Sequence, residues 1–141
     1  MIDSIKNLSE KYFNKIVAIR RHIHQNPELS FQEHETSKYI KSILDSWNIS
    51  YVDNIANTGI LAIIEGKNPK KKCIAVRADF DALPIEEENE VEYCSVNKGV
   101  MHACGHDVHT SSMLGAVKIL NELKEEWEGT MVMEEKLFSE E

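Results

Sequence analysis

The sequence predicts a layered α/β domain, because segments with helical periodicity stand on both sides of short runs with strand character. Apolar residues recur at steps of three and four between residues 5 and 23, which is the spacing of one helix face. Residues 60–65 and 73–77 are short apolar runs typical of strands. A chain of 141 residues is long enough for one domain with one core.

The composition is that of an ordinary globular protein, with 42% hydrophobic and 28% charged residues. The net charge of −8 argues against nucleic acid and anionic membrane surfaces as partners, since both bind basic patches. We expect no membrane-spanning segment and no signal peptide, because no apolar run is long enough and none stands at the N-terminus. A cytoplasmic protein is therefore predicted, with free thiols at Cys73, Cys94 and Cys104.

The first helix carries the apolar stripe between residues 5 and 23. It is expected to end near Asn26-Pro27, since the residue before a proline avoids the helical conformation. A second helix is predicted from Ser30, because Ser30 and Glu33 have the spacing of a capping box. Four side chains at this junction are predicted to be surface or capping residues: His22, His24, Glu28 and Glu33.

Three strands should follow, at residues 50–52, 60–65 and 73–77. The near-continuous apolar run of residues 73–77 predicts a strand that is buried on both faces. The lysine-rich turn at 66–72 is interpreted as a solvated hairpin loop rather than an anion site. Residues 79–100 are predicted to be irregular, and the run Glu86-Glu87-Glu88 within them to be solvated.

A third helix is predicted from about Val108 to Lys124, and residues 129–133 have the character of a last strand. The apolar face of this third helix would consist of Met113, Leu114, Val117, Leu120 and Leu123. The preceding loop therefore leads into a helix N-terminus.

That loop, residues 101–109, places one thiol, three imidazoles and a carboxylate within nine positions. Thiolate and imidazole are the usual ligands of zinc and its neighbours. Cys104 and His106 can converge on one side of an extended segment or turn, and Gly105 lets the backbone bend closely around an ion. The alternative is a buried free cysteine beside a helix-capping histidine. The segment is at most half of a metal site, because two protein ligands rarely suffice.

Asp79 and Asp81 follow directly on the strand at 73–77, and active sites of open α/β sheets lie at the carboxyl ends of strands. They could ligate a cation or orient a ligand, or they could simply form a turn. Asp107 is placed either to hold a ligating imidazole or to act as a first-turn acid. His109 is a candidate ligand, substrate contact or hydrogen-bond donor to a ligand, with a surface histidine as the alternative.

Three segments together resemble successive motifs of the M20 metallopeptidases: RHIHQNPELS at 21–30, RADFDALPI at 77–85 and MHACGHDVH at 101–109. The resemblance is to the amidohydrolase branch, which includes N-acyl-amino-acid amidohydrolases, hippurate hydrolases and auxin-conjugate hydrolases. It implies a three-layer zinc-exopeptidase-like catalytic domain with a central mixed sheet. Full-length members carry a second, smaller domain that mediates homodimerisation.

The resemblance also implies a chemistry, which is metal-dependent hydrolysis of the amide bond of N-acyl amino acids. Two divalent metals occupy the family's site, with zinc, manganese, cobalt or nickel as candidates here. Cys104 and His106 match metal ligands, Asp81 matches the acid that supports the site, and Asp79 falls where related peptidases have a metal-binding histidine. The family's general base is a glutamate of a Q-P-A-E-E motif, and three further ligands lie later in the chain.

The sequence departs from this pattern after Gly129-Thr130, where no Gln-Pro precedes a glutamate pair and Glu140-Glu141 end the chain. We therefore expect residues 1–141 to be the N-terminal part of a truncated M20-type catalytic domain. The dimerisation domain, the general-base motif and the later ligands are missing, so the chain alone is expected to be inactive. The alternatives are a non-catalytic remnant and an interaction module with weak metal binding.

Overall fold

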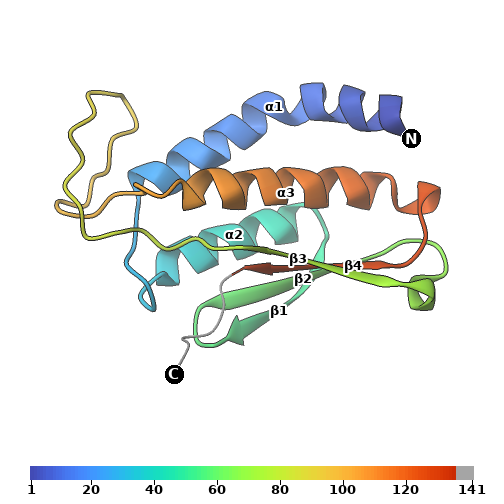
Figure 1. Ribbon diagram of the computed structural model, residues 1–141. Helices are drawn as coiled ribbons and strands as arrows, with labels where there is room; N and C mark the ends of the chain where they lie inside the picture. The colour runs from blue at the N-terminus through green and yellow to red at the C-terminus, as the bar shows by residue number, and fades with distance from the viewer. Residues whose placement is uncertain (136–141) are drawn as a thin grey trace.

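Helices pack on a mixed sheet in the computed structural model, which describes residues 1–135 (Figure 1). The helices are α1 (Ile2–Gln25), α2 (His34–Ser46) and α3 (His106–Glu122), and the strands are β1 (Ser50–Ile55), β2 (Gly59–Glu65), β3 (Cys73–Ala78) and β4 (Thr130–Glu135). Short 3₁₀ helices lie at Pro69–Lys71 and Lys124–Glu126. The predicted α/β class with a mixed sheet is confirmed. Within residues 1–135 helices cover one face of that sheet, so two of the three expected layers are present (Figure 1).

The four strands lie in the order β1-β2-β4-β3. The β1–β2 and β2–β4 pairs are antiparallel, whereas β3 and β4 are parallel. Parallel neighbours need a crossover connection, and here α3 forms it. The crossover leaves the carboxyl end of β3, travels through residues 79–105, and enters α3. This topology brings the two predicted groups of site residues to one end of the sheet.

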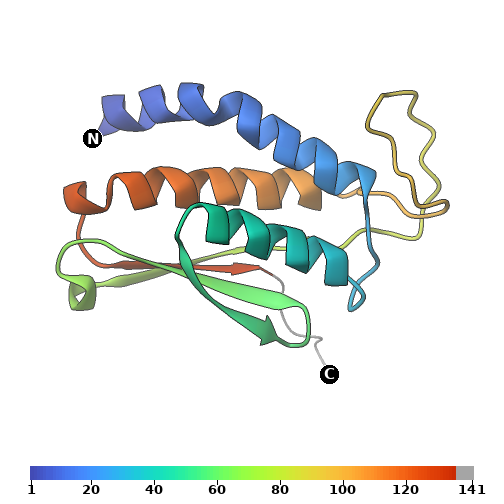
Figure 2. The ribbon, with the colours of Figure 1, turned by 180° about the vertical axis from the view of Figure 1, so that it is seen from behind.

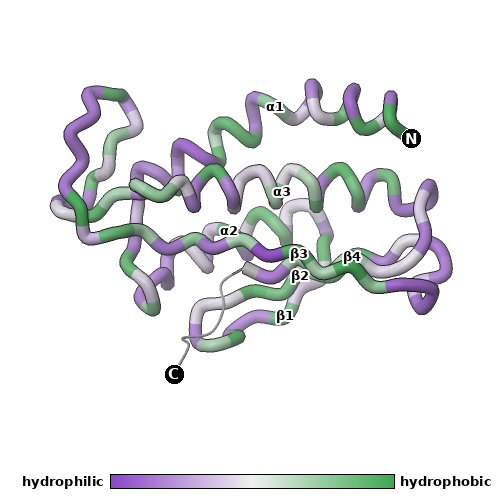
Figure 3. The backbone as a smooth tube through the Cα atoms, in the orientation of Figure 1, coloured by the Kyte–Doolittle hydropathy of each residue, from purple (hydrophilic) through white to green (hydrophobic). Residues whose placement is uncertain are grey.

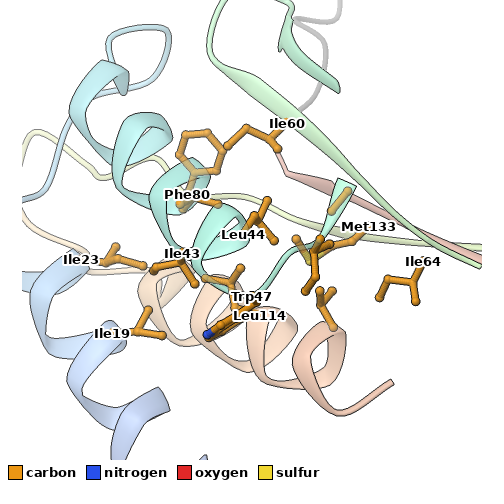
Figure 4. Close-up of a cluster of buried hydrophobic side chains, with 14 residues drawn as sticks. Ile19, Ile23, Ile43, Leu44, Trp47, Ile60, Ile64, Phe80, Leu114 and Met133 are labelled. Atoms are coloured by element: carbon orange, nitrogen blue, oxygen red, sulfur yellow. The ribbon is translucent and has the colours of Figure 1, made fainter. Parts of the chain in front are cut away.

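All three helices lie on the same side of the sheet, with α1 outermost and packed on α3 (Figures 1 and 2). Apolar side chains from the helices and from β2 and β4 meet between these layers in one core (Figure 4). Fully buried members include Ile40, Leu44, Ile60, Phe80, Leu114, Val117 and Met133. Burial of each such side chain stabilises the fold by roughly 1.5–3 kcal/mol.

The prediction that β3 is buried on both faces is wrong. Ile74 is 53% exposed and Cys73 is also exposed. Within residues 1–135, β3 lies at a sheet edge, and the face opposite the helices has no covering layer. The lysine-rich turn that precedes β3 is hydrophilic and exposed, as predicted (Figure 3). It does not close a hairpin, because β4 lies between β2 and β3 in the sheet.

The start of α2 also differs from its prediction, because Ser30 does not cap the helix. Ser30 is exposed in a turn, and α2 begins at His34. The cap comes instead from Glu28, whose carboxylate accepts hydrogen bonds from the backbone N–H groups of Glu35 at 3.2 Å and Thr36 at 2.7 Å. A carboxylate satisfies unpaired N–H groups and favours the positive end of the helix dipole.

The other three junction residues have different surroundings. His22 is exposed and stacks on Tyr39, as a surface residue would. Glu33 is fully buried, so its assignment to the surface is wrong, but it does occupy the N-cap position of α2. Its carboxylate makes no capping bond and instead accepts a hydrogen bond from Thr58 Oγ1 at 3.0 Å. His24 is only 4% exposed, and the prediction of a surface residue is wrong there too.

Element boundaries otherwise follow the predictions closely. The first helix ends at Gln25 with Asn26 as its cap, and β1 continues three residues beyond its predicted end at Val52. The third helix begins two residues early, at His106. Among the described residues, no helix combines the length and apolar character that crossing a membrane requires.

Candidate metal centre

The candidate centre lies where β3 ends and α3 begins. Phe80 is fully buried in the core (Figure 4), and it anchors the segment that carries the partly exposed carboxylates of Asp79 and Asp81. The returning chain pairs with this segment, because Leu83 and Met101 exchange backbone hydrogen bonds of 2.9 and 3.0 Å. The fold therefore holds the 101–106 segment beside the end of β3.

This pairing brings together Asp81 and His106. Nδ1 of His106 lies 3.0 Å from the Oδ1 atom and 3.0 Å from the backbone oxygen of Asp81. When Nδ1–H donates to these acceptors, the ring is held in one tautomer and Nε2 keeps its lone pair. A carboxylate that orients an imidazole in this way is typical of metal-binding histidines.

Cys104 and His106 flank the N-cap residue of α3. Gly105 is the N-cap of α3 and has a φ of 83°, a left-handed conformation that glycine adopts without strain. Cys104 is exposed, so its thiol is accessible. A thiol and an imidazole Nε2 fit part of a site for zinc or a neighbouring metal.

The chain does not complete a metal site within its described part. No group of three or more His, Cys, Asp or Glu side chains in residues 1–135 is placed to hold an ion. The two predicted ligands thus offer two donors, and a stable centre would need more.

Asp79 and His109 lie at the margins of this centre. The carboxylate of Asp79 pairs with Arg77, and its backbone oxygen accepts a hydrogen bond from Thr110 Oγ1 at 2.9 Å. His109 is exposed in the first turn of α3, with its ring centroid 5.8 Å from that of His106.

Asp107 directly follows His106 but faces a different part of the molecule. Its carboxylate is 0% exposed, and its Oδ2 atom lies 2.7 Å from Nε of Arg20 and 2.8 Å from Nδ1 of His24. Both partners belong to α1. Asp107, in the first turn of α3, therefore does hold an imidazole, but it is the ring of His24 and not that of a predicted metal ligand.

His24 extends these contacts into the acidic loop, the irregular segment 79–100 that contains the run Glu86-Glu87-Glu88. Its Nε2 atom lies 2.9 Å from Oε1 of Glu87, whose side chain is only 4% exposed. The prediction of a solvated run at 86–88 is thus wrong for Glu87, although Glu86 and Glu88 are exposed. A protonated His24 ring can donate to both of its carboxylate partners.

The pKa of Glu87 reflects these contacts. Burial raises it, but hydrogen bonds from His24, the Ser95 backbone N–H and the Asn89 amide outweigh burial and lower the pKa to about 2. The Ser95 N–H lies 2.6 Å from Oε2. Glu87 is therefore held in its charged form.

His102 is the second buried histidine of this region. Its ring lies 6.3 Å from that of His24, and neither ring nitrogen has a hydrogen-bond partner among the described residues. Burial lowers the pKa of His102, Asp107 and Asp81 oppose that shift, and His24 and His106 add to it; the resulting pKa is about 4. A neutral imidazole with unpaired nitrogens is a place where buried water is common.

Periodicity alone did not identify Arg20, His24 and Glu87. The available signal was that Arg20 and His24 are four residues apart, and therefore neighbours on one helix face. His24 also lies inside the first of the three family-like segments. Nothing local in the sequence distinguishes Glu87 from the glutamates beside it.

Comparison with known proteins gives consistent matches. A sequence profile described as peptidase family M20/M25/M40 matches residues 75–133. An IAA-amino acid hydrolase of Arabidopsis thaliana (ILR1-like 5) is 48% identical over 125 residues, covering 88% of this chain and 28% of that protein. An N-acyl-L-amino acid amidohydrolase of Geobacillus stearothermophilus is 42% identical over 127 residues, covering 90% of this chain and 34% of that protein.

A solved structure is similar as well. The YXEP protein of Bacillus subtilis, described as a dinuclear metal binding peptidase from the M20 family, matches with a TM-score of 0.82 and 41% identity. The match covers 89% of this chain and 35% of that one. The chain thus spans only about a third of the length of the proteins it resembles.

Proposed function

Because this chain belongs to peptidase family M20/M25/M40, we propose that it represents the first part of a metal-dependent amidohydrolase domain that acts on N-acyl amino acids. The names of two relatives, an N-acyl-L-amino acid amidohydrolase and an IAA-amino acid hydrolase, support this substrate class. The observation that carries the proposal is the contact between Asp81 and His106, beside the exposed thiol of Cys104.

Each of these residues has a defined task. Asp81 accepts a hydrogen bond from Nδ1–H of His106 and so leaves Nε2, on the far side of the ring, free to bind a metal. Cys104 supplies the second donor after its thiol loses a proton. Divalent metal, when bound, lowers the pKa of a water and polarises an amide carbonyl. The dinuclear metal binding described for the Bacillus subtilis structure supports two ions, with zinc, manganese, cobalt or nickel as candidates.

The hydrolytic step needs a proton acceptor that the described residues do not identify. The family's general-base glutamate belongs to a Q-P-A-E-E motif that this sequence does not contain. Glu140-Glu141, the pair nearest the expected distance, lie outside the described residues. We therefore propose that residues 1–141 alone do not hydrolyse amides, and that the later ligands and the dimerisation domain of the family are not encoded within them.

Calorimetric titration of the 141-residue chain with zinc and with manganese tests the metal site. Binding that disappears in Cys104→Ala supports the proposal, although two donors alone should bind metal weakly. Cys73→Ala, which removes another exposed thiol, is the matched control. Absence of binding, or binding that Cys104→Ala leaves unchanged, contradicts it. Metal-dependent turnover of an N-acyl amino acid by the purified chain would contradict the proposed inactivity.

A second candidate function is an interaction module without catalysis. The observation that favours it is the edge strand β3, where Ile74 and Cys73 are exposed and the strand's outer hydrogen-bonding groups have no neighbouring strand within residues 1–135. Light scattering distinguishes the two candidates, because a module that pairs through this edge forms assemblies that Ile74→Lys disrupts. The free thiols are consistent with a cytoplasmic location for either function.

A further inference from the structure

A chain of polar and charged side chains, buried except at Arg20, links α1, α3 and the acidic loop next to the candidate metal centre. It consists of Arg20 and His24 on α1, Asp107 on α3, and Glu87 in the loop. The loop is the yellow segment that stands beside the ends of α1 and α3 in Figure 1. These segments are far apart in the sequence and are joined here by side-chain contacts.

The two consecutive residues His106 and Asp107 are held by different partners. Successive side chains on a helix point about 100° apart, since a turn contains 3.6 residues. The His106 ring is held from the β3 end by Asp81, at 3.0 Å. The Asp107 carboxylate is held from α1 by His24, at 2.8 Å. Together these contacts fix the rotation of the first turn of α3 about its own axis.

The start of α3 has a further tether in the hydrogen bond from Thr110 Oγ1 to the backbone oxygen of Asp79 at 2.9 Å, but it has no side-chain cap. Its N-cap is Gly105, which makes no side-chain capping bond, and an added Cβ there would meet nothing within 4 Å. Glycine leaves the backbone free to adopt several conformations. The contacts of Asp107 with α1 therefore supply an orientation that the Cys104-Gly105-His106 segment does not determine by itself.

Because these contacts are buried, breaking one of them is costly. Asp107 is 0% exposed, and its Oδ1 atom has no hydrogen-bond partner among the described residues. Removal of one partner from a buried ion pair leaves a charge without compensation, which is strongly unfavourable. The network thus tolerates little displacement of α3 relative to α1.

We propose that Asp107 is a positioning residue for the metal-binding segment, acting through Arg20 and His24 to hold His106 in register with Asp81. Asp107 would not hold the metal itself, because its carboxylate contacts Arg20 and His24 on α1. The expected effect of Asp107 on metal affinity rests on the proposed function. The expected effect of Asp107 on the tautomer of His106 is independent of that function.

The test compares Asp107→Asn with the unmodified 141-residue chain by nitrogen-15 NMR of the imidazole rings, with His106 assigned from the spectrum of His106→Gln. The unmodified chain should show His106 as the single Nδ1–H tautomer. A folded Asp107→Asn chain should show averaged tautomers for His106. Asp53→Asn is the matched control, because Asp53 pairs with Lys41 at 3.0 Å on the β1–α2 side of the fold.

Cobalt titration, followed through the thiolate-to-cobalt charge-transfer band, gives the second readout. The dissociation constant should rise about tenfold in Asp107→Asn and stay unchanged in Asp53→Asn. A merely structural loss of stability would leave His106 in one tautomer within the folded population. A folded Asp107→Asn chain that keeps the single tautomer overturns the proposal.

Two further outcomes remain decisive. If the unmodified chain binds no cobalt, the proposed metal function fails, while the tautomer comparison still decides the role of Asp107. If circular dichroism shows that Asp107→Asn does not fold, Arg20→Gln replaces it. Arg20 is the more exposed end of the network, at 27%, so its loss perturbs the fold less and should produce the same change in His106.

Discussion

The imidazole of His106 and the carboxylate of Asp81 lie in hydrogen-bond contact, 3.0 Å from Nδ1 to Oδ1, although 25 residues separate them in the chain. The contact joins the carboxyl end of β3 to the N-terminus of α3, the two places where the sequence pointed to chemistry. It leaves the Nε2 atom of His106 as the nitrogen available to a metal.

This contact predicts unequal roles for the two aspartates after β3. Asp81→Ala should weaken cobalt or zinc binding by about 10- to 100-fold, the usual effect of removing a carboxylate that orients a ligating imidazole. Asp79→Ala should have a smaller effect, because the Asp79 carboxylate pairs with Arg77. Calorimetric titration of both variants measures the difference, and equal losses would argue against the orienting role of Asp81.

Gly105 should be replaceable by a residue that tolerates its backbone conformation. Gly105→Ala is expected to destabilise the fold by about 1–2 kcal/mol, because its φ of 83° is unfavourable for alanine. No steric clash contributes, since a Cβ would meet nothing within 4 Å. Gly105→Asn should recover part of the loss, because asparagine visits this conformation more readily. Urea unfolding compares the three chains, and an Ala variant as stable as the parent would refute the argument.

Glu87 should make the fold sensitive to acid. Its pKa is lowered from 4.5 to about 2 in the folded chain, so between these values the unfolded chain binds more protons. Its stabilising contribution is therefore complete above pH 4.5 and is lost as the pH falls toward 2. Thermal unfolding from pH 5 to pH 2.5 should show a shallower pH dependence for Glu87→Gln than for the parent. Glu86→Gln, at an exposed neighbour, should leave the dependence unchanged.

The cap of α2 provides a test of the fold that is independent of the metal centre. Glu28→Ala should reduce stability by about 1 kcal/mol, because two backbone N–H groups lose their acceptor. Ser30→Ala should be nearly neutral, since Ser30 is exposed and does not cap the helix. Urea unfolding of both variants measures the difference. A larger loss of stability in Ser30→Ala than in Glu28→Ala would support the capping box that the sequence predicted.

Much of the fold could be predicted because its signals are local. Two patterns arise within single elements: the helical periodicity between residues 5 and 23 and the apolar run at 60–65. The predicted bounds of α1 and β2 therefore agree closely with the structure. The segment 101–109 was recognisable for the same reason, because its ligand-type side chains are adjacent in the chain. By itself, the sequence determined the helices, most strands, the candidate ligands Cys104 and His106, and the family resemblance.

Tertiary structure alone decided which charged side chains are buried. His24 meets Asp107 across 83 residues and Glu87 across 63, so no window of sequence contains either contact. The same holds for β3, whose apolar run predicted burial but which lies at a sheet edge. Whether a side chain is buried depends on which surfaces the whole chain brings together. A local sequence pattern shows only that a segment would favour burial.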